Sequence, residues 1–163
     1  MNRFASAPWA SFILLATDLI PLAAASVPAD ELLAPNAKLE KVAGELRFSE
    51  GPAWHPDGYL LFEDIPRNRI MKLDAAGNVT VFREPSGHSN GLAFDKERRL
   101  VAAEGNSTGG GRRISRTEKD GKVVTLADRY NGKRLNSPND LAIDAVGRIY
   151  FTDPRYGSQE GVE

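Results

Sequence analysis

Cysteine is absent from the 163-residue chain, which excludes disulfide scaffolds, thiolate zinc sites and cysteine nucleophiles. An excess of charge of one sign is also absent, because 21 basic side chains nearly balance 22 acidic ones. The basic patches expected of a nucleic-acid-binding protein are therefore missing. Aromatic residues make up only 8% of the chain, and no apolar run reaches the roughly 20 residues that a membrane span needs. What is left is the composition of an ordinary globular domain, with no nucleic-acid partner and no membrane span expected.

The first 25 residues differ in kind from the rest of the chain. A short basic start at Arg3 leads into an apolar stretch over residues 12–25, which ends on three consecutive alanines. This pattern is typical of a secretory signal peptide with a small-residue cleavage site. We therefore predict a signal peptide over residues 1–25, a linker over residues 26–38, and a secreted or periplasmic protein. Asp18 opposes membrane insertion, so a frayed N-terminal extension is the alternative.

Three segments of the chain align with one another without gaps. They cover residues 50–64 (EGPAWHPDGYLLFED), 90–104 (NGLAFDKERRLVAAE) and 139–153 (NDLAIDAVGRIYFTD). Each begins with a carboxylate or amide side chain and continues as an apolar strand, a polar turn and a second apolar strand. The second strands are expected at residues 60–62, 100–102 and 149–151. The sequence thus predicts three equivalent β-hairpins.

A second type of hairpin lies between these rows. It is expected over residues 70–73 and 79–82, and again over residues 114–117 and 123–126, with a polar turn in each case. The rows begin at Glu50, Asn90 and Asn139, which are 40 and 49 residues apart, so each period holds four short strands. Four strands in about 40 to 50 residues is the size of a β-propeller blade, whereas a β-sandwich, the main alternative, need not repeat in fours.

The predicted fold is accordingly all-β and of the propeller type, with about two and a half blades in residues 39–163. Propellers close with typically four to eight blades. We therefore expect the chain to be the N-terminal part of a larger propeller, to assemble with other copies, or to be a fragment without independent function. Open blade edges expose unpaired strands, which favours self-association.

The residues that start the three rows are candidates for a metal site. In a propeller the innermost strands surround the central channel, so Glu50, Asn90 and Asn139 are expected to face one another. Their carboxylate and amide oxygens are ligands for hard cations such as Ca²⁺ or Mg²⁺. Glu-Gly-Pro and Asn-Gly are also ordinary strand-entry turns, and this alternative stays open on the residues alone.

Several motifs in one order resemble the SMP-30/gluconolactonase family. They are SEGPAW (residues 49–54), SNGLA (89–93), GRRISR (111–116), LNSPND (135–140) and YFTDPRY (150–156). The resemblance runs from about residue 39 to residue 163. It implies a six-bladed propeller with a divalent metal in its channel and hydrolysis of a sugar lactone or a related lactone.

The resemblance also implies roles for individual residues. Glu50 and Asn139 match metal-binding positions, most simply for Ca²⁺, with Zn²⁺, Mn²⁺ or Mg²⁺ possible. Asn90, His88 and Arg155 are weaker candidates for binding substrate. The family's catalytic base is expected beyond residue 163, so no catalytic residue is assigned and the chain is expected to be weakly active or inactive alone. A non-catalytic propeller that binds a partner, or a truncated fragment, is the alternative.

Two further sets of side chains are expected to be structural or solvated. His55 lies in the turn of the first hairpin, where solvent exposure is expected. Arg112, Arg113 and Arg116 alternate with apolar residues on a predicted strand, so they are expected on its solvated face.

Overall fold

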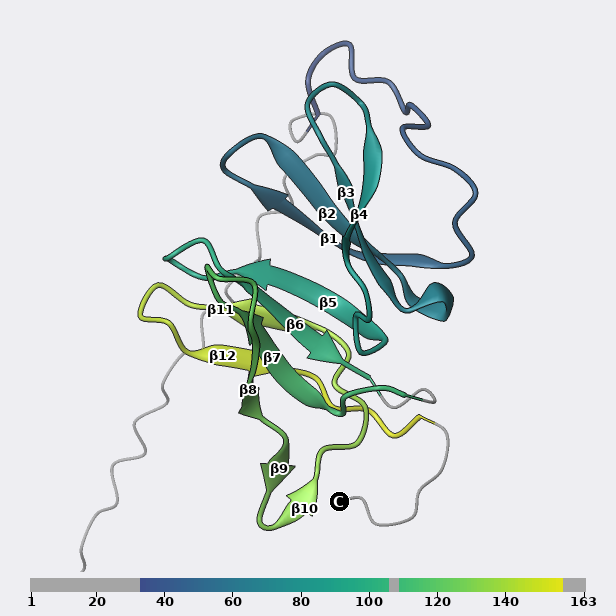
Figure 1. The fold of residues 1–163 in the computed structure, drawn as a ribbon. Coiled ribbons are helices and arrows are strands. Elements are labelled where there is room, and N and C mark those ends of the chain that lie inside the picture. The colour runs from purple at the N-terminus through teal and green to yellow at the C-terminus, as the bar shows by residue number, and fades with distance from the viewer. Residues whose placement is uncertain (1–32, 106–108, 157–163) are drawn as a thin grey trace, which may run out of the picture. The chain divides into compact units, whose positions relative to one another are not determined.

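The computed structural model describes residues 33–105 and 109–156, and Figure 1 shows an almost purely β architecture for them. The chain divides into two units, Met1–Glu40 and Lys41–Glu163. Of the first unit only residues 33–40 are described, as exposed chain with one turn. The predicted signal peptide and residues 26–32 of the predicted linker lie outside the described residues. Within the described ranges, no helix is long and apolar enough to cross a membrane.

The second unit contains two complete four-stranded sheets, which we call blades 1 and 2, and a hairpin of the third row, which we call blade 3. Each complete sheet is an antiparallel meander in sequence order. Blade 1 consists of β1 (Ser49–His55), β2 (Tyr59–Asp64), β3 (Arg69–Leu73) and β4 (Val79–Arg83). Blade 2 consists of β5 (Ser89–Phe94), β6 (Leu100–Glu104), β7 (Arg113–Thr117) and β8 (Val123–Ala127). In the described part of blade 3, β11 (Leu141–Ile143) pairs with β12 (Ile149–Phe151). The predicted all-β propeller organisation is confirmed.

The strand registers repeat as closely as the sequence rows do. Ala53 pairs with Leu61 in blade 1, and the equivalent Ala93 pairs with Val101 in blade 2. The inner hairpins of blades 1 and 2 carry an irregularity at the row-starting residue, between positions 50 and 53 and between positions 89 and 92. A bulge at this place bends the strand and redirects the side chain that precedes it. The first two rows thus share the backbone distortion at the row start as well as the hairpin.

The hydrophobic core lies between neighbouring blades. Blade 1 faces blade 2 through one cluster, and partly buried Tyr59 and Phe94 pack against it. The buried members are Ala53, Leu61, Ile70, Leu92, Leu100 and Ala102. Val101, Ala103 and Ile114 form a second cluster, against which three residues of blade 3 pack. Because successive side chains of a strand point to opposite faces, β6 supplies Leu100 and Ala102 to one cluster and Val101 and Ala103 to the other.

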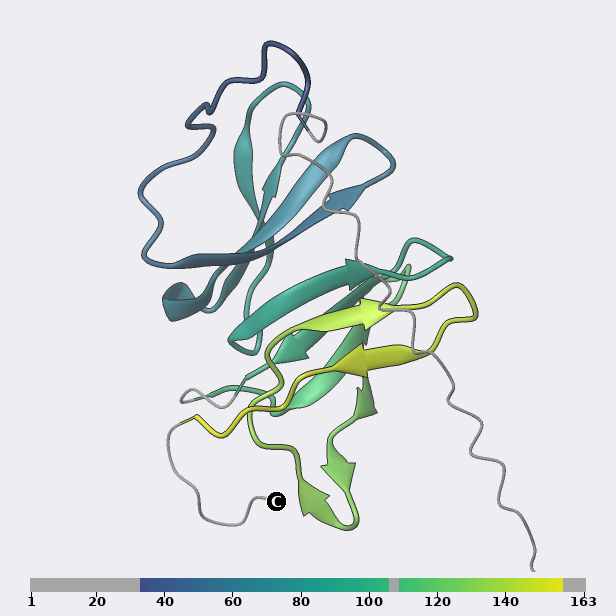
Figure 2. The ribbon, with the colours of Figure 1, turned by 180° about the vertical axis from the view of Figure 1, so that it is seen from behind.

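This packing places the inner strands side by side. Strand β1 contacts β5, and β5 contacts β11, as Figure 2 shows from behind. Trp54 is 66% exposed, although the equivalent Phe94 packs in the core. The reason is that Phe94 faces blade 1, whereas the described residues place no sheet against the corresponding face of blade 1.

A short 3₁₀ helix and a small hairpin were not predicted from the sequence. The 3₁₀ helix η1 (Ile65–Arg67) follows β2, with Pro66 in its first turn and Asn68 in the left-handed conformation at its end. Strands β9 (Arg129–Tyr130) and β10 (Lys133–Arg134) form a small hairpin between blades 2 and 3. Neither has the alternation of apolar residues that identifies a core strand, because neither packs in a core.

The expectation that His55 is exposed is wrong. Its exposed fraction is 5%, and its ring stacks on Tyr59 with centroids 4.4 Å apart. Phe94 meets the same ring edge-on at 4.6 Å. Nδ1 of His55 accepts a hydrogen bond from the backbone N–H of Asp57 at 3.1 Å. Polar turn composition suggested exposure, but the aromatic residues of two blades close over the ring.

Arg112, just before β7, and Arg113, on β7, make more contacts within the fold than a solvated face implies. Nε of Arg112 donates to the carbonyl oxygens of Leu135 and Asn136, at 2.8 and 3.1 Å. Arg113 makes a two-point contact with the buried carboxylate of Glu104, at 2.7 and 3.2 Å. Both guanidinium groups therefore tie chain segments together, and the expectation of a simple solvated face is wrong for them.

Candidate metal and substrate site

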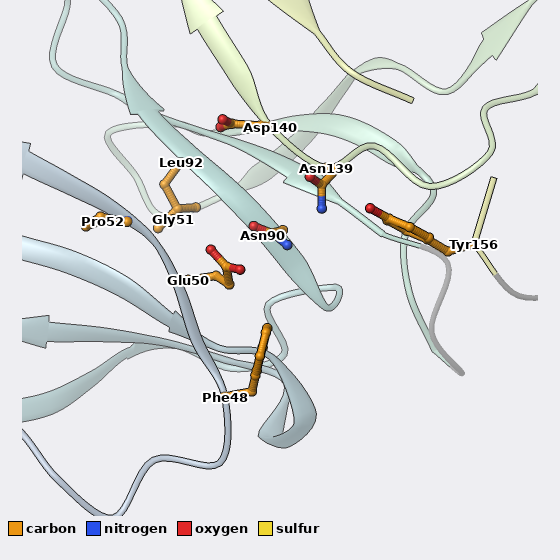
Figure 3. Close-up of a pocket in the computed structure, with 9 residues that line it drawn as sticks. All are labelled: Phe48, Glu50, Gly51, Pro52, Asn90, Leu92, Asn139, Asp140 and Tyr156. Carbon is orange, nitrogen blue, oxygen red and sulfur yellow. The ribbon is translucent and has the colours of Figure 1, made fainter. Parts of the chain in front are cut away.

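The residues that start the three rows meet at one pocket of about 540 Å³. Glu50 reaches it from β1, Asn90 from β5 and Asn139 from the segment that leads into β11. Figure 3 shows the Glu50 carboxylate and the Asn90 side chain on neighbouring strands, with the Tyr156 hydroxyl pointing toward Asn139. The remaining lining residues are Phe48, Gly51, Pro52, Leu92 and Asp140. The sequence prediction that Glu50, Asn90 and Asn139 converge therefore agrees with the geometry.

Two glycines allow the row starts to come so close. A Cβ atom on Gly51 would lie 1.8 Å from the carbonyl oxygen of Asn90, and Gly51 also has a positive φ of 56°. A Cβ atom on Gly91 would lie 2.6 Å from Oδ1 of Asp140 and 2.7 Å from its Cα. Only glycine fits where one inner strand meets the next at this distance. The Glu-Gly and Asn-Gly pairs are thus needed for packing around the pocket, beyond their ordinary use in turns.

Hydrogen bonds fix the backbone at Asn139. Its carbonyl oxygen accepts a bond of 2.6 Å from the N–H of Gly91, and its own N–H donates to the carbonyl oxygen of Thr152 at 3.0 Å. The first bond joins blade 3 to blade 2, and the second joins the two sides of the blade 3 hairpin. The backbone at Asn139 is therefore held by blade 2 and by its own hairpin, although it lies just before β11.

The side chains in the pocket suit a hard cation in kind but are few in number. Glu50 offers a carboxylate, and Asn90 and Asn139 offer amide oxygens, which are donors that Ca²⁺ and Mg²⁺ accept. Calcium takes about six to eight oxygens, which is more than these three side chains supply. In residues 33–105 and 109–156, no group of three or more His, Cys, Asp and Glu side chains could hold a metal. The pocket thus gathers oxygen donors of the kind that a hard cation accepts, in a smaller number than Ca²⁺ takes.

The two other sequence candidates lie outside this pocket lining. The backbone N–H of His88 donates to Oδ1 of Asn68 at 2.9 Å, and its Nδ1 lies 2.8 Å from the carbonyl oxygen of Ile65. These contacts tie His88 to the end of η1. Arg155 is exposed beyond β12. A substrate-binding role for either residue stays a prediction.

Phe48 and Asp140 line the pocket but were not candidates from the sequence. Phe48 lies just before the first row and is 56% exposed. Asp140 follows Asn139 directly, at the position that glycine occupies after Glu50 and Asn90. This break in the repeat is the sequence signal that could have identified Asp140, whereas nothing in the rows identifies Phe48.

A buried pair of polar residues includes the residue that directly precedes Asn90 in the chain. Glu63 on β2 is fully buried, and its Oε1 accepts a hydrogen bond from the hydroxyl of Ser89, which directly precedes Asn90. Burial raises the pKa of Glu63 to about 8, although the Ser89 bond and the charge of Arg83 act in the opposite direction. The carboxyl is therefore mainly neutral at pH 7, so it adds little negative charge to the site.

Comparison with known proteins places these features in a family. The family described as SMP-30/Gluconolactonase/LRE-like region matches residues 48–163. A protein from Zymomonas mobilis subsp. mobilis named gluconolactonase is 34% identical over 142 residues, which cover 78% of this chain and 39% of that protein. The chain thus spans about two fifths of the length of the curated relative it matches.

Comparison with solved structures supports the same family. A gluconolactonase from Xanthomonas campestris superposes with a TM-score of 0.63 at 38% identity, over 69% of this chain and 37% of that one. A putative gluconolactonase gives 0.69 at 32% identity, over 78% and 44%. A virginiamycin B lyase from Staphylococcus aureus, at 19% identity and a TM-score of 0.52 over 65% of this chain and 34% of that one, shares the fold alone. With the repeated inner hairpins and their row-starting residues, these matches show that the chain belongs to the SMP-30/gluconolactonase/LRE-like family.

Proposed function

We propose that the pocket binds a divalent cation and serves the hydrolysis of a sugar lactone or a related lactone. The observation that supports this most is that Glu50, Asn90 and Asn139, from three successive inner hairpins, line one pocket. Its volume of about 540 Å³ lies within the range of small-molecule sites. Relatives named gluconolactonase support the lactone as the substrate class. Calcium suits the oxygen donors best, with Zn²⁺, Mn²⁺ and Mg²⁺ as alternatives.

The side chains of the pocket divide the work by chemistry. Glu50 and Asn139 would hold the cation through carboxylate and amide oxygens, and a bound cation supplies polarisation of a lactone carbonyl. The amide NH₂ of Asn90 can donate a hydrogen bond to an oxygen of the substrate. The apolar ring of Phe48 bounds the pocket on one side. Together these groups can bind and orient a small polar ring.

We expect low or no turnover from this chain alone. Glu50, Asn90, Asn139 and Asp140 bring oxygen donors to the pocket, and none of them is placed as a catalytic base. Cation binding without turnover would instead fit the alternative of a non-catalytic binding module. The turnover can be measured directly by monitoring the acid that lactone hydrolysis releases, with Ca²⁺, Zn²⁺ or Mn²⁺ added. Cation-dependent turnover by monomeric chain would contradict the expectation.

Cation binding tests the site itself. Terbium luminescence or calorimetry with Ca²⁺ should show affinity that Glu50→Gln lowers by about tenfold, which corresponds to about 1.4 kcal/mol. Glu84→Gln is the matched control, because Glu84 is an exposed carboxylate that does not line the pocket. Equal affinity of the wild-type chain and Glu50→Gln would remove Glu50 from the proposed site.

We also propose that the protein is exported and that residues 1–25 are removed. The basic start, the apolar stretch and the three alanines support this. N-terminal sequencing of protein recovered from outside the cytoplasm should give a start after Ala25. An intact N-terminus on cytosolic protein would contradict export.

Self-association through the edge of β12 is a further part of the proposal. In the described ranges β12 pairs with β11 alone, and Tyr150 and Phe151 are exposed on it. Backbone groups at such an edge can pair with another strand. Light scattering should show species larger than the monomer, and Tyr150→Lys should reduce them. A strictly monomeric chain at high concentration would contradict this proposal.

A further inference from the structure

The first and third inner hairpins end on a carboxylate that binds the backbone entering the same hairpin. At the end of β2, Oδ1 of Asp64 accepts hydrogen bonds from the N–H groups of Arg47 and Phe48, at 3.1 and 3.4 Å. After β12, Oδ1 of Asp153 accepts from the N–H of Ser137 at 2.7 Å. Its Oδ2 accepts from the N–H of Asn136 at 2.8 Å. The same device therefore occurs in two blades.

In both blades the held residues stop two positions before a pocket residue. Phe48 precedes Glu50 by two residues, and Ser137 precedes Asn139 by two. The short spacing leaves one residue between the anchored peptide and the residue that faces the pocket. In blade 3 that residue is Pro138, whose ring restricts φ and stiffens the connection. A shift of the anchored peptide therefore carries over to the direction of the pocket side chain.

Asp64 is buried, and Asp153 is half-buried with buried bonding partners. Asp64 is 1% exposed, and Arg67 pairs with its Oδ2 at 2.8 Å. Asn136 and Ser137 are buried as well, and Nδ2 of Asn136 adds a bond of 3.1 Å to Oδ2 of Asp153. Carboxylates that accept several N–H bonds away from water hold them more firmly than neutral acceptors do.

Blade 2 has a different arrangement at the equivalent position. Its row ends on Glu104, which is one methylene longer and binds the side chains of Arg83 and Arg113. Within the described residues, the hydrogen bonds that its carboxylate accepts come from these two arginine side chains. The device is thus specific to the two blades that provide Glu50 and Asn139, the two residues proposed to hold the cation.

We infer that Asp64 and Asp153 are positioning residues that direct Glu50 and Asn139 into the pocket through the backbone they anchor. This inference rests on the proposed cation site. It distinguishes these two carboxylates from Asp144, whose backbone hydrogen bonds stay within the turn of the blade 3 hairpin.

The chain contains a matched control for each residue. Oδ1 of Asp144, in the turn of the blade 3 hairpin, accepts from the N–H groups of Val146 and Arg148 at 3.0 and 2.9 Å. Its Oδ2 accepts from Nε of Arg148 at 2.6 Å. In the turn after β3, Oδ1 of Asp74 accepts from the N–H groups of Ala76 and Asn78, both at 2.9 Å. Each control thus accepts two backbone N–H groups through Oδ1, and asparagine replaces this charged acceptor by a neutral one, far from the row starts along its strand.

The experiment compares four variants of the full 163-residue chain. Asp64→Asn and Asp153→Asn should weaken terbium binding about tenfold, whereas Asp74→Asn and Asp144→Asn should stay within about twofold of the wild-type chain. Urea unfolding of all four shows whether the stability losses are comparable. Equal affinity losses in the test and control variants, or none in the test variants, would overturn the inference.

NMR spectra of the metal-free chain separate this inference from the proposed function. Asp153→Asn should shift the side-chain amide resonance of Asn139, and Asp144→Asn should leave it in place. If the wild-type chain binds no cation, the proposed function fails, and this resonance alone decides the inference. If Asp153→Asn does not fold, Asp153→Glu keeps the charge but moves the oxygens by one methylene. An unmoved Asn139 amide in that variant would equally overturn the inference.

Discussion

Replacing Glu63 by glutamine should make the stability of the chain less dependent on pH. Glu63 is fully buried in β2, its Oε1 accepts from Ser89, and its Oε2 has no hydrogen-bond partner within the described residues. Burial raises its pKa from 4.5 to about 8. The Ser89 bond and the charge of Arg83 lower it only in part, while the charge of Glu104 raises it further.

The raised pKa of Glu63 determines how the stability of the wild-type chain changes with pH. Below about pH 4.5 the carboxyl is protonated in both states and burial of the charge costs nothing. As the pH rises toward about 8, the unfolded chain ionises while the folded chain keeps its proton, so the wild-type chain loses stability. At about 1.4 kcal/mol per pKa unit, the loss is about 3 kcal/mol at pH 7 and at most about 5 kcal/mol above pH 8. Glutamine is uncharged throughout, so Glu63→Gln should escape this loss.

Urea unfolding followed by tryptophan fluorescence measures the effect at a series of pH values. At pH 7 the midpoint of Glu63→Gln should exceed that of the wild-type chain by about 2 M, taking a denaturant slope of about 1.5 kcal/mol/M. The difference should shrink toward pH 5. Glu84→Gln is the control, because Glu84 is exposed. A difference between Glu63→Gln and wild type that stays constant from pH 5 to pH 8 would refute the reasoning.

Two other perturbations have defined outcomes. Gly91→Ala would place a Cβ atom 2.7 Å from Cα of Asp140, so it should cost about 1–3 kcal/mol of unfolding free energy and weaken cation binding, as urea unfolding and terbium titration would show. Gly44→Ala meets only the flexible side chain of Lys41 and should be neutral; similar costs for both variants would argue against the close approach. Burial of Asp64 is outweighed by bonds from Arg67 and two backbone N–H groups, so its pKa lies below the usual 3.8. The contribution of Asp64 to stability is therefore present above pH 3.8 and is lost as the pH falls below that value. In thermal unfolding, Asp64→Asn should lose less stability than the wild-type chain as the pH is lowered through this range. An equal loss in both chains would contradict the assignment.

The repeat and the strands were predictable because they depend on local patterning. Apolar alternation, polar turns and the recurrence of the rows every 40 to 49 residues predicted the eight strands of the two complete blades and the blade 3 hairpin. The side-chain period of two then determines which residues face each neighbouring blade, as the split of Leu100 and Val101 between two clusters illustrates. The row starts Glu50, Asn90 and Asn139 followed from the same alignment.

Side-chain environments were much less predictable. His55 has the sequence context of an exposed turn residue, yet aromatic rings from two blades bury it. Arg113 alternates with apolar residues like a solvated side chain, yet it pairs with a carboxylate from the neighbouring strand. The environment of such a side chain depends on the groups that neighbouring strands and blades bring close to it. The residue pattern of a single strand does not specify those groups.

By itself the sequence determined the repeat, the four-stranded period, the candidate cation ligands and the family resemblance, because each of these is a pattern along one chain. Only the tertiary structure showed that Gly51 and Gly91 are needed for close approach and that Glu63 is buried beside Ser89. It also showed that Asp64 and Asp153 anchor the peptides leading to the row starts. These facts concern distances between residues far apart in the chain. Such distances are set by the packing of one blade on the next, which no local pattern specifies.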